Sequence, residues 1–506
     1  MTRVLIRECR TLGGPVSSVY VVDGKIEKVG GEPSTLPEDT EVIHANGGTI
    51  LPGLIDSHCH PFEYGWLKRS VDLRGTTNIT GLRLRLQAGV NRASPGEWVT
   101  GMGWDQEAFP GKSFPTHLDI DDISSSNPVA LTRACGHIAL LNRRAIEQLG
   151  LATRQGGEFV RDPAGNLTGI VKEGALTEVY ARIPRSIERS AADLQSVEAE
   201  AGRMGLTTLH CIVSPEAYAE ELEALALLRS SGALALRYRV YVPPEAIDAA
   251  DGWRKKLQGD RVRINGVKIY ADGSLGARTA ALSESYSDDP GNRGMLRYTD
   301  AQLTSLVERA DAKGYQVIVH AIGDRAVEQA IDALSGVAGA ANPLRHRIEH
   351  VSIFPKYMRS EAARHGIRVT VQPLFITSDT WAEARLGRDR IADLYPLRSI
   401  FRDGMIASGG SDSPVESMSP ILAMWAAMTR GGDSTSESLD MRQALDLYTS
   451  NAASNGLDEL AEVKEGFPAN LTLFDSDATG MHPALFRKLG ALATVVDGVV
   501  VHSYGG

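Results

Sequence analysis

Residues 50–61 read ILPGLIDSHCHP, an apolar run that ends on two histidines. His58 and His60 are separated by one residue, so in a strand both side chains point to the same face. Asp56 precedes His58 by two residues and shares this direction if the strand is regular. These polar groups are either hydrogen-bonded core residues or part of a metal site, and the rest of the chain must decide between the two.

The composition is that of a globular protein with a sizeable core. The chain has 506 residues, of which 42% are hydrophobic and 23% charged, and its net charge is −10. The isoelectric point is about 5.7. Nucleic acids and anionic membranes both favour basic surfaces. We therefore expect neither nucleic acid nor a membrane as a partner, while the acidity by itself names no substrate.

Cysteine usage and the apolar pattern favour the cytoplasm. The four cysteines contain no Cys-x-x-Cys pair, which argues against a disulfide framework or a structural zinc module. No apolar stretch approaches the roughly 20 residues that a membrane helix needs. Arg3, Arg7 and Arg10 interrupt the first apolar run, so we expect no secretory signal. The expected location is cytoplasmic.

Both ends of the chain read as short strands. Residues 16–30, VSSVYVVDGKIEKVG, form a predicted hairpin with an Asp-Gly turn, and residues 492–503, LATVVDGVVVHS, show the same pattern. We expect residues 1–50 and 463–506 to build one small β-sandwich domain. Two unrelated edge hairpins are the alternative.

The centre of the chain alternates strand-like and helix-like segments. Eight apolar, β-branched runs occur, at 50–56, 206–213, 235–242, 263–271, 315–321, 345–351, 368–374 and 404–409. This count is typical of an α/β fold with a (β/α)8 TIM-type barrel, here within residues 51–462, whose active site lies at the carboxyl ends of the strands. Residues 62–205 form a large insertion after the first barrel strand. We interpret this insertion as a lid or substrate-binding subdomain.

Four further polar residues fall in or just after predicted barrel strands. Lys268 lies in NGVKIYADGS, His320 ends YQVIVH, His350 ends HRIEH, and Asp412 follows MIASGGS. Each alone has an ordinary reading: a strand-end histidine is often a core group, and Asp412 could cap the helix expected near Ser419. Together with the two histidines of residues 50–61, they indicate a metal site at the mouth of the barrel.

The motifs that carry these residues resemble the amidohydrolase superfamily. LPGLIDSHCH, VKIYADGSLGARTA, VIVHAIGD, HRIEH and GSDSPV are similar to the branch that includes N-substituted formamide deformylases, amidohydrolase family 3. VKEGFPANLTLFD resembles the usual return strand into the β-sandwich of this superfamily. The resemblance spans nearly the whole chain.

The resemblance implies a binuclear metal site with two divalent metal ions, for which zinc is expected. Its implied ligands are His58, His60, Lys268, His320, His350 and Asp412. One metal would be held by His58, His60 and Asp412, and the second by His320 and His350. Lys268 is implied to be carboxylated, because an ammonium group cannot bind a metal, and its carbamate would bridge the two ions. A mononuclear site is the alternative if Lys268 stays unmodified.

The implied reaction is hydrolysis of a non-peptide C–N bond, of the amide or formamide type, in a small molecule. Two cations that share one water lower its pKa enough to supply a bridging hydroxide near neutral pH. The hydroxide would attack the carbonyl carbon, with Asp412 as the general base that passes the proton to the departing amine. Analogy with the superfamily also suggests a homodimer.

Five other residues have two open readings each. His137 is a candidate catalytic residue that stabilises the oxyanion, or else a core or capping histidine. Asp272 and Arg278 either contact the substrate or order the loop after the fourth strand. Trp104 is a candidate substrate contact or a packed aromatic. Glu349 fits a packing or hydrogen-bonding carboxylate better than a metal ligand.

Three other functions compete with amide hydrolysis. Deaminases of the superfamily use a glutamate three residues after the fifth-strand histidine, and Gly323 stands at that position here. A lactone or phosphoester hydrolase would use the same site. A non-catalytic binding protein of this fold is disfavoured because every expected ligand is present.

Overall fold

The computed structural model describes residues 2–135, 137–154, 156, 158–257, 259–339, 341–432, 435–458 and 461–504. They form two compact units. Unit 1 comprises Met1–Glu63 and Leu194–Gly506, and unit 2 comprises Tyr64–Asp193. The sequence placed the insertion at residues 62–205, whereas the chain returns to unit 1 within α5 (Ile187–Arg203).

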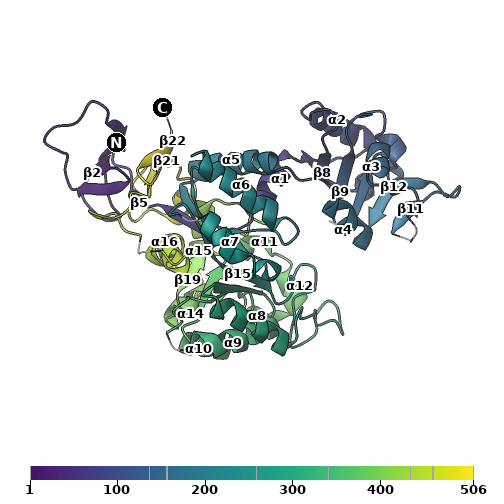
Figure 1. Ribbon diagram of the computed structural model, residues 1–506. Coiled ribbons are helices and arrows are strands. Elements are labelled where there is room, and N and C mark those ends of the chain that lie inside the picture. The colour runs from purple at the N-terminus through teal and green to yellow at the C-terminus, as the bar shows by residue number, and fades with distance from the viewer. Residues whose placement is uncertain are drawn as a thin grey trace. The chain divides into compact units, whose positions relative to one another are not determined.

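Unit 1 contains an eight-stranded parallel barrel (Figure 1). Its strands, in order around the barrel, are β6 (Leu54–Cys59), β13 (Leu206–Ile212), β14 (Arg237–Val242), β15 (Val262–Tyr270), β16 (Gln316–Ala321), β17 (Arg347–His350), β18 (Arg368–Val371) and β19 (Ala407–Gly409). The segment after β19 joins the first strand: Asp412 N donates to His58 O at 2.7 Å, and His60 N donates to Ser413 O at 2.8 Å. The predicted barrel is confirmed.

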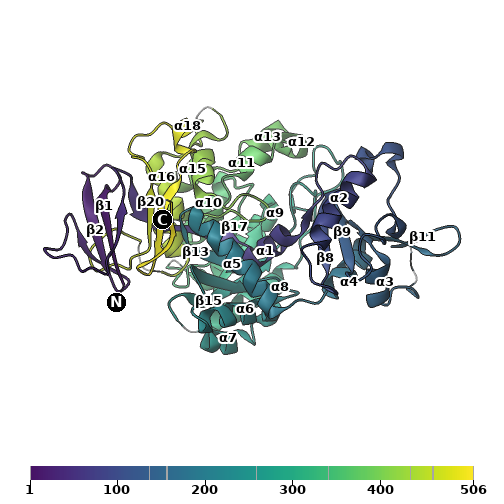
Figure 2. The same ribbon diagram turned by 90° about the horizontal axis from the view of Figure 1, so that it is seen from above.

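Helices pack around the outside of the strands, as Figure 2 shows from above. They are α6 (Tyr218–Ser230), α7 (Ala250–Lys256), α8 (Asp300–Ala312), α9 (Asp324–Ala338), α10 (Lys356–Arg364), α14 (Leu397–Arg402), α15 (Pro420–Thr429), α16 (Met441–Tyr448) and α17 (Ser450–Asn455). Thr299 and Gln302 form a capping box at the start of α8, and Ser419 caps α15. The long segment between β18 and α14 carries three short helices, α11 (Phe375–Ser378), α12 (Ala382–Leu386) and α13 (Arg388–Ile391).

Two four-stranded sheets bring the ends of unit 1 together. The first contains β3 (Lys25–Val29), β2 (Ser17–Val22), β1 (Arg3–Cys9) and β4 (Glu41–His44); the second contains β22 (Val499–Ser503), β21 (Ala491–Val496), β20 (Leu471–Phe474) and β5 (Ile50–Pro52). Both sheets contribute buried residues to one hydrophobic cluster, for example Val21 and Val495. The purple and yellow strands lie side by side in Figures 1 and 2.

Gly53 divides one continuous apolar stretch between these two architectures. β5 pairs with β20 in the small sheet, whereas β6, which begins at Leu54, pairs with β13 in the barrel. A Cβ atom at Gly53 would lie 2.3 Å from Thr207 Oγ1, so only glycine allows the chain to pass here. The sequence predicted one strand over this stretch, and the structure contains two.

Unit 2 is built around its own six-stranded sheet. The strand order is β11 (Phe159–Arg161), β12 (Leu167–Lys172), β10 (Ile138–Leu141), β9 (Val129–Arg133), β8 (Val99–Trp104) and β7 (Val71–Asp72). The helices α2 (Ile79–Val90), α3 (Arg143–Gln148) and α4 (Glu173–Ala181) accompany the sheet, and α1 (Pro61–Arg69) enters the unit from β6. Successive residues of β9 belong to different hydrophobic clusters, Ala130 to one and Leu131 to the other. The sheet therefore buries both of its faces.

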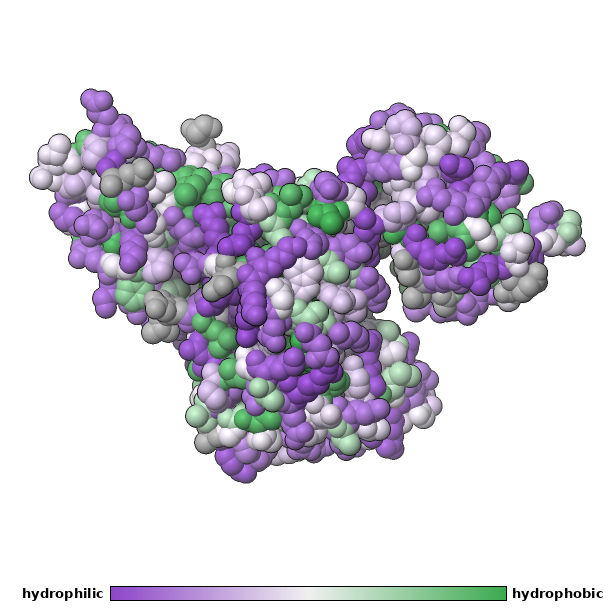
Figure 3. Space-filling model, viewed as in Figure 1, coloured by the Kyte–Doolittle hydropathy of each residue, from purple (hydrophilic) through white to green (hydrophobic). Residues whose placement is uncertain are grey.

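Within the described residues no helix has the length and apolar character needed to cross a bilayer. On the face drawn in Figure 3, hydrophobic residues form small groups among more numerous hydrophilic ones.

Candidate metal centre

The six predicted ligands all belong to unit 1 and lie in or just after its barrel strands. His58 lies in β6, Lys268 in β15 and His320 in β16, while His350 ends β17. His60 follows β6, and Asp412 follows β19. Because the carboxyl ends of parallel barrel strands meet at one rim, residues far apart in sequence converge there.

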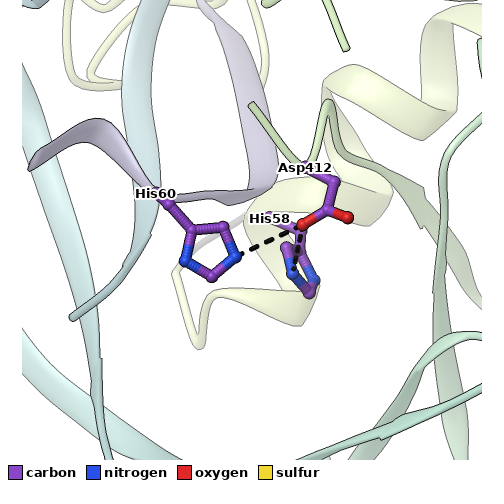
Figure 4. A group of neighbouring side chains, drawn as sticks. All are labelled: His58, His60 and Asp412. Carbon is purple, nitrogen blue, oxygen red and sulfur yellow. Dashed lines mark ion pairs between the residues drawn. The ribbon is translucent and has the colours of Figure 1, made fainter. Parts of the chain in front are cut away.

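Three of these side chains meet closely, as Figure 4 shows. One ligand atom from each of His58, His60 and Asp412 lies within 4.8 Å of the others. Asp412 Oδ1 lies 3.1 Å from His58 Nε2 and 3.3 Å from His60 Nε2. His58 is fully buried, whereas 17% of the His60 side chain is exposed.

The other three predicted ligands lie next to this group. Lys268 Nζ is 3.3 Å from His58 Nε2. The ring centroids of His58 and His350 are 4.8 Å apart, and those of His320 and His350 are 4.5 Å apart. The structure thus brings all six residues into one continuous cluster.

Two of the cluster residues have unusual backbone angles. The φ of His350 is +74° and that of Asp412 is +55°, which is the left-handed region that residues with a Cβ seldom adopt. In a regular strand His350 would point away from the face used by Glu349. The positive φ turns the His350 ring toward His58 and His320, and such local strain is typical of functional sites.

Hydrogen bonds orient the two buried histidine rings. His58 Nδ1 lies 2.5 Å from Glu349 Oε2, and His350 Nδ1 lies 2.8 Å from Gln372 Oε1. Since a carboxylate and an amide oxygen can only accept, each Nδ1 donates and therefore carries a proton. This pattern is the one that metal-binding histidines adopt.

His320 is oriented through its other nitrogen. Its Nε2 lies 2.9 Å from the carbonyl oxygen of Gly273, to which it donates. The His320 ring packs beside the Tyr270 and His350 rings, whose centroids lie 5.4 and 4.5 Å from its own. Each of the three rings is thus oriented by a hydrogen bond through one of its nitrogens.

The charge states favour metal binding. Burial lowers the pKa of the His350 imidazole well below its ordinary range, so the ring is neutral. Burial acts to raise the pKa of Asp412, but the neighbouring His58 and His60 outweigh it and hold that pKa well below its usual range. Burial also lowers the pKa of the Lys268 ammonium to about 8, although Glu349 and Asp412 act in the opposite direction.

The donor set fits a divalent metal ion. Asp412 Oδ1 lies beside the Nε2 atoms of both His58 and His60. Two imidazole nitrogens and one carboxylate oxygen are ligands that zinc-like ions take. His58, His60 and Asp412 would therefore hold such an ion, with His320, His350 and Lys268 beside it.

Two buried aspartates near the centre serve the backbone. Asp56 accepts from His58 N, Ser411 N and Ser411 Oγ at 3.1, 3.0 and 2.6 Å, so it ties β6 to the segment after β19. Burial raises the pKa of Asp56 to about 6, although these hydrogen bonds act to lower it.

Asp272 is fully buried, and both of its oxygens accept from backbone N–H groups of Ala281, Ile322 and Gly323. Asp272 therefore orders its loop, and its Oδ1 also lies 3.4 Å from His320 Nε2; its role as a substrate contact stays a prediction.

The remaining predicted substrate contacts are engaged elsewhere. Arg278 forms a two-point ion pair with Asp288 at 3.1 and 2.9 Å in the same loop. In unit 2, Trp104 is fully buried in a hydrophobic cluster, and its Nε1–H donates to Leu131 O at 2.7 Å. Trp104 has no surface left for a ligand, so its reading as a substrate contact is replaced by that of a packed aromatic.

His137, the predicted oxyanion group, also belongs to unit 2. It is exposed, and its Nδ1 lies 3.3 Å from Glu173 Oε2, another exposed group. Its carbonyl oxygen accepts from Glu173 N at 3.0 Å. Within unit 2 it is therefore neither a core nor a buried capping residue, and its catalytic role stays a prediction.

Sequence reasoning missed Gln372 as a partner of His350. Gln372 directly follows β18 and precedes a proline. A polar residue at the end of a barrel strand was the signal that the sequence offered for this contact with His350. It also left open what Glu349 touches, because that contact joins β17 to β6 across the barrel interior.

An eight-stranded barrel with clustered metal-binding groups at the carboxyl ends of its strands has the architecture of a barrel metalloenzyme. The model of the Amidohydrolase family matches residues 41–502. The chain therefore belongs to the amidohydrolase family. Its structural neighbours include metal-dependent hydrolases.

Individual relatives agree over nearly the full length. The chain is 30% identical over 516 aligned positions to a putative amidohydrolase, YtcJ, of Bacillus subtilis (strain 168), covering 97% of this chain and 96% of the relative. It is 25% identical over 517 positions to an N-substituted formamide deformylase of Arthrobacter pascens, covering 96% and 94%. A solved structure of an uncharacterized metal-dependent hydrolase from Pyrococcus furiosus matches with a TM-score of 0.81 and 29% identity, covering 95% of this chain and 99% of that one.

Proposed function

We propose that this chain hydrolyses a non-peptide C–N bond, of the amide or formamide type, in a small molecule. The observation that carries the proposal is the convergence of Asp412 Oδ1 with the Nε2 atoms of His58 and His60 at the barrel rim. The name of the deformylase relative supports the bond type.

We also propose that the site holds two divalent metal ions, with zinc as the first choice. His58, His60 and Asp412 would hold one ion, and His320 and His350 the second. Divalent ions, when bound, lower the pKa of water toward neutrality and polarise a substrate carbonyl.

Lys268 would join the two ions as a carbamate. Carboxylation needs the neutral amine: its Nζ forms a bond to the carbon of carbon dioxide, and one proton is lost to solvent. The pKa of about 8 for buried Lys268 keeps part of the population neutral near physiological pH. The resulting anion would take the place of a bridging carboxylate ligand.

Asp412 is the proposed general base. Its carboxylate accepts the proton of the attacking water and delivers it to the amine nitrogen as the C–N bond breaks and the new C–O bond forms. Water thereby supplies the hydroxyl group of the acid product and the proton of the amine product. Its position beside the two histidines fits this role, because a base must lie within reach of the attacking oxygen.

The structure gives an argument against the deaminase alternative. Gly323 occupies the position at which deaminases of the superfamily have a glutamate. Here a Cβ at Gly323 would lie 2.0 Å from Ala281 O, and the Gly323 N–H donates to Asp272. No side chain fits this position, so the carboxylate that deamination would need is not merely missing but sterically excluded.

Metal analysis followed by an activity screen tests the proposal. Purified protein should contain divalent metal, lose turnover with a chelator and regain it when metal is restored. The panel should include N-formyl, N-acyl and cyclic amide compounds, with lactones and amino-substituted heterocycles for comparison. Turnover of lactones or amino heterocycles alone would replace the proposed reaction.

Metal-free native protein would favour a binding role instead. In that case the double variant His58→Ala plus His60→Ala should bind small molecules as the native chain does.

A further inference from the structure

A charged pair on β17 lies inside the barrel, directly beneath the candidate metal centre. The side chains of Arg347 and Glu349 are both fully buried, and Arg347 Nε donates to Glu349 Oε1 at 2.6 Å. The two residues are separated by one position in a strand, so they share a face. Burying two charges costs free energy that a pair of apolar residues would not cost. This pair therefore calls for a reason other than stability.

Glu349 connects Arg347 to a predicted metal ligand. Its Oε1 accepts from Arg347, and its Oε2 accepts the Nδ1 proton of His58 at 2.5 Å. Each oxygen thus has a different partner. Rotation of the carboxylate would break both hydrogen bonds, so the position of Arg347 fixes the orientation of the His58 ring.

Arg347 also holds the backbone of the ligand strand. Its Nη2 donates to Ser57 O at 3.2 Å, and Ser57 immediately precedes His58. Arg347 therefore contacts β6 both directly and through Glu349. A planar guanidinium can serve both contacts at fixed angles, which the single ammonium of a lysine cannot do.

The remaining nitrogen of the guanidinium, Nη1, is held by residues of other elements. Nη1 donates to the Tyr241 hydroxyl at 2.8 Å and to Asn455 O at 3.0 Å. The Tyr241 hydroxyl in turn donates to Gln316 Oε1 at 2.7 Å. Contacts from β14, β16 and the end of α17 thus determine where Arg347 lies.

We propose that Arg347 is a positioning residue of the metal centre: it acts through Glu349 and Ser57 O to hold His58 with its Nε2 atom directed at the ligand cluster. The inference rests on the metal site of the proposed function. It predicts that Arg347 contributes to metal affinity although it does not approach the metal ligand atoms itself. Partners of ligating histidines typically contribute about 10- to 100-fold to metal affinity.

The barrel offers a matched control in Arg239 of β14. This side chain is equally buried, and its Nε and Nη2 donate to Asp458 at 2.8 Å each. Its Nη1 donates to the carbonyl oxygens of Tyr238 and Asp260. Arg239 is thus a second buried interior arginine with a carboxylate partner, but that partner is Asp458 and not a group that binds His58.

The test compares Arg347→Lys, Glu349→Gln and Arg239→Lys with the native protein. Apo-protein is titrated with Zn2+ against a chelating competitor, and the absorption spectrum is recorded after loading with Co2+. Arg347→Lys and Glu349→Gln should bind Zn2+ about 10- to 100-fold more weakly, with a changed Co2+ spectrum. Arg239→Lys should match the native affinity and spectrum, even if its unfolding midpoint falls as far as that of Arg347→Lys.

Equal losses of metal affinity in Arg347→Lys and Arg239→Lys, or unchanged affinity in Arg347→Lys, would overturn the inference. If Arg347→Lys does not fold, Glu349→Gln decides, because its amide cannot accept from both Arg347 and His58 through the same two oxygens. Failure of the native protein to bind Zn2+ and Co2+ at all would instead refute the proposed function, and the inference with it.

Discussion

Asp412 Oδ1 lies 3.1 Å from His58 Nε2, and this approach joins the segment after the last barrel strand to the first strand at the candidate metal centre. The same two residues are also joined through the backbone, since Asp412 N donates to His58 O. The position of the Asp412 carboxylate is therefore set by the barrel itself rather than by a free loop.

Asp412→Asn separates metal binding from proton transfer. The amide retains the size of the carboxylate and one oxygen ligand, but it cannot accept a proton. We expect at least one metal ion to remain while kcat falls by about 10²- to 10⁴-fold. Metal content and steady-state turnover of an amide substrate measure this. Unimpaired turnover would remove Asp412 as the base.

Lys268→Ala tests the carbamate. Without the amine no bridging ligand can form, so we expect the metal-to-protein ratio to fall and turnover to be lost. Added short-chain carboxylic acids should restore part of the activity, because a free carboxylate can occupy the vacated position.

Isotopically labelled bicarbonate gives a direct control for Lys268. Native protein should show a carbamate signal in the NMR spectrum, and Lys268→Arg should show none. Native protein with full metal content and no such signal would establish a site built on unmodified Lys268.

His137→Asn tests the predicted oxyanion role in unit 2. If His137 donates to the developing oxyanion, kcat should fall by roughly 10²- to 10³-fold with unchanged metal content. Glu173→Gln is the matched control, since it removes the ion pair with His137 but leaves the imidazole in place. Equal kcat values in the native protein and His137→Asn would reduce His137 to a surface residue.

His210 should make the protein sensitive to acid. It is fully buried in β13, and among the described residues neither of its ring nitrogens has a hydrogen-bond partner. Burial, reinforced by Arg347 and Arg239, lowers its pKa well below the ordinary value of 6.5. Below about pH 6.5, His210 is therefore protonated in the unfolded chain but stays neutral in the folded chain. The free energy of unfolding consequently decreases as the pH falls below that value.

The free-energy loss from His210 is about 1.4 kcal/mol for each pH unit below that value, until the folded-state pKa is reached. His210→Leu removes this term. Urea unfolding at about pH 5 and about pH 8 should therefore show a smaller difference for His210→Leu than for the native protein. An identical pH dependence in both proteins would contradict the assignment.

The barrel and the cluster of predicted metal ligands could be predicted because both are visible in local sequence patterns. Apolar runs of strand length are visible, and His58, His320 and His350 stand out where such runs end. The side-chain direction of His350 was not predictable. It depends on a φ of +74°, whereas the alternation rule assumes regular strand angles.

Contacts between distant strands were beyond sequence reasoning for a different reason. The hydrogen bond from His58 to Glu349 depends on the stagger of β6 and β17 within the barrel, which hydrophobic patterns do not encode. Trp104 shows the same limit in unit 2: the sequence reveals a tryptophan near a strand end, but its burial depends on how the sheet packs.

The pairing of β5 with β20 also orders events during translation. Ile50–Pro52 leaves the ribosome early, but its hydrogen-bonding partner Leu471–Phe474 is made only after all eight barrel strands. Because domains generally fold as units while the chain grows, the barrel can assemble before the second small sheet has its strands. Until then the nascent protein exposes the unpaired edge of β5, immediately before the strand that carries His58.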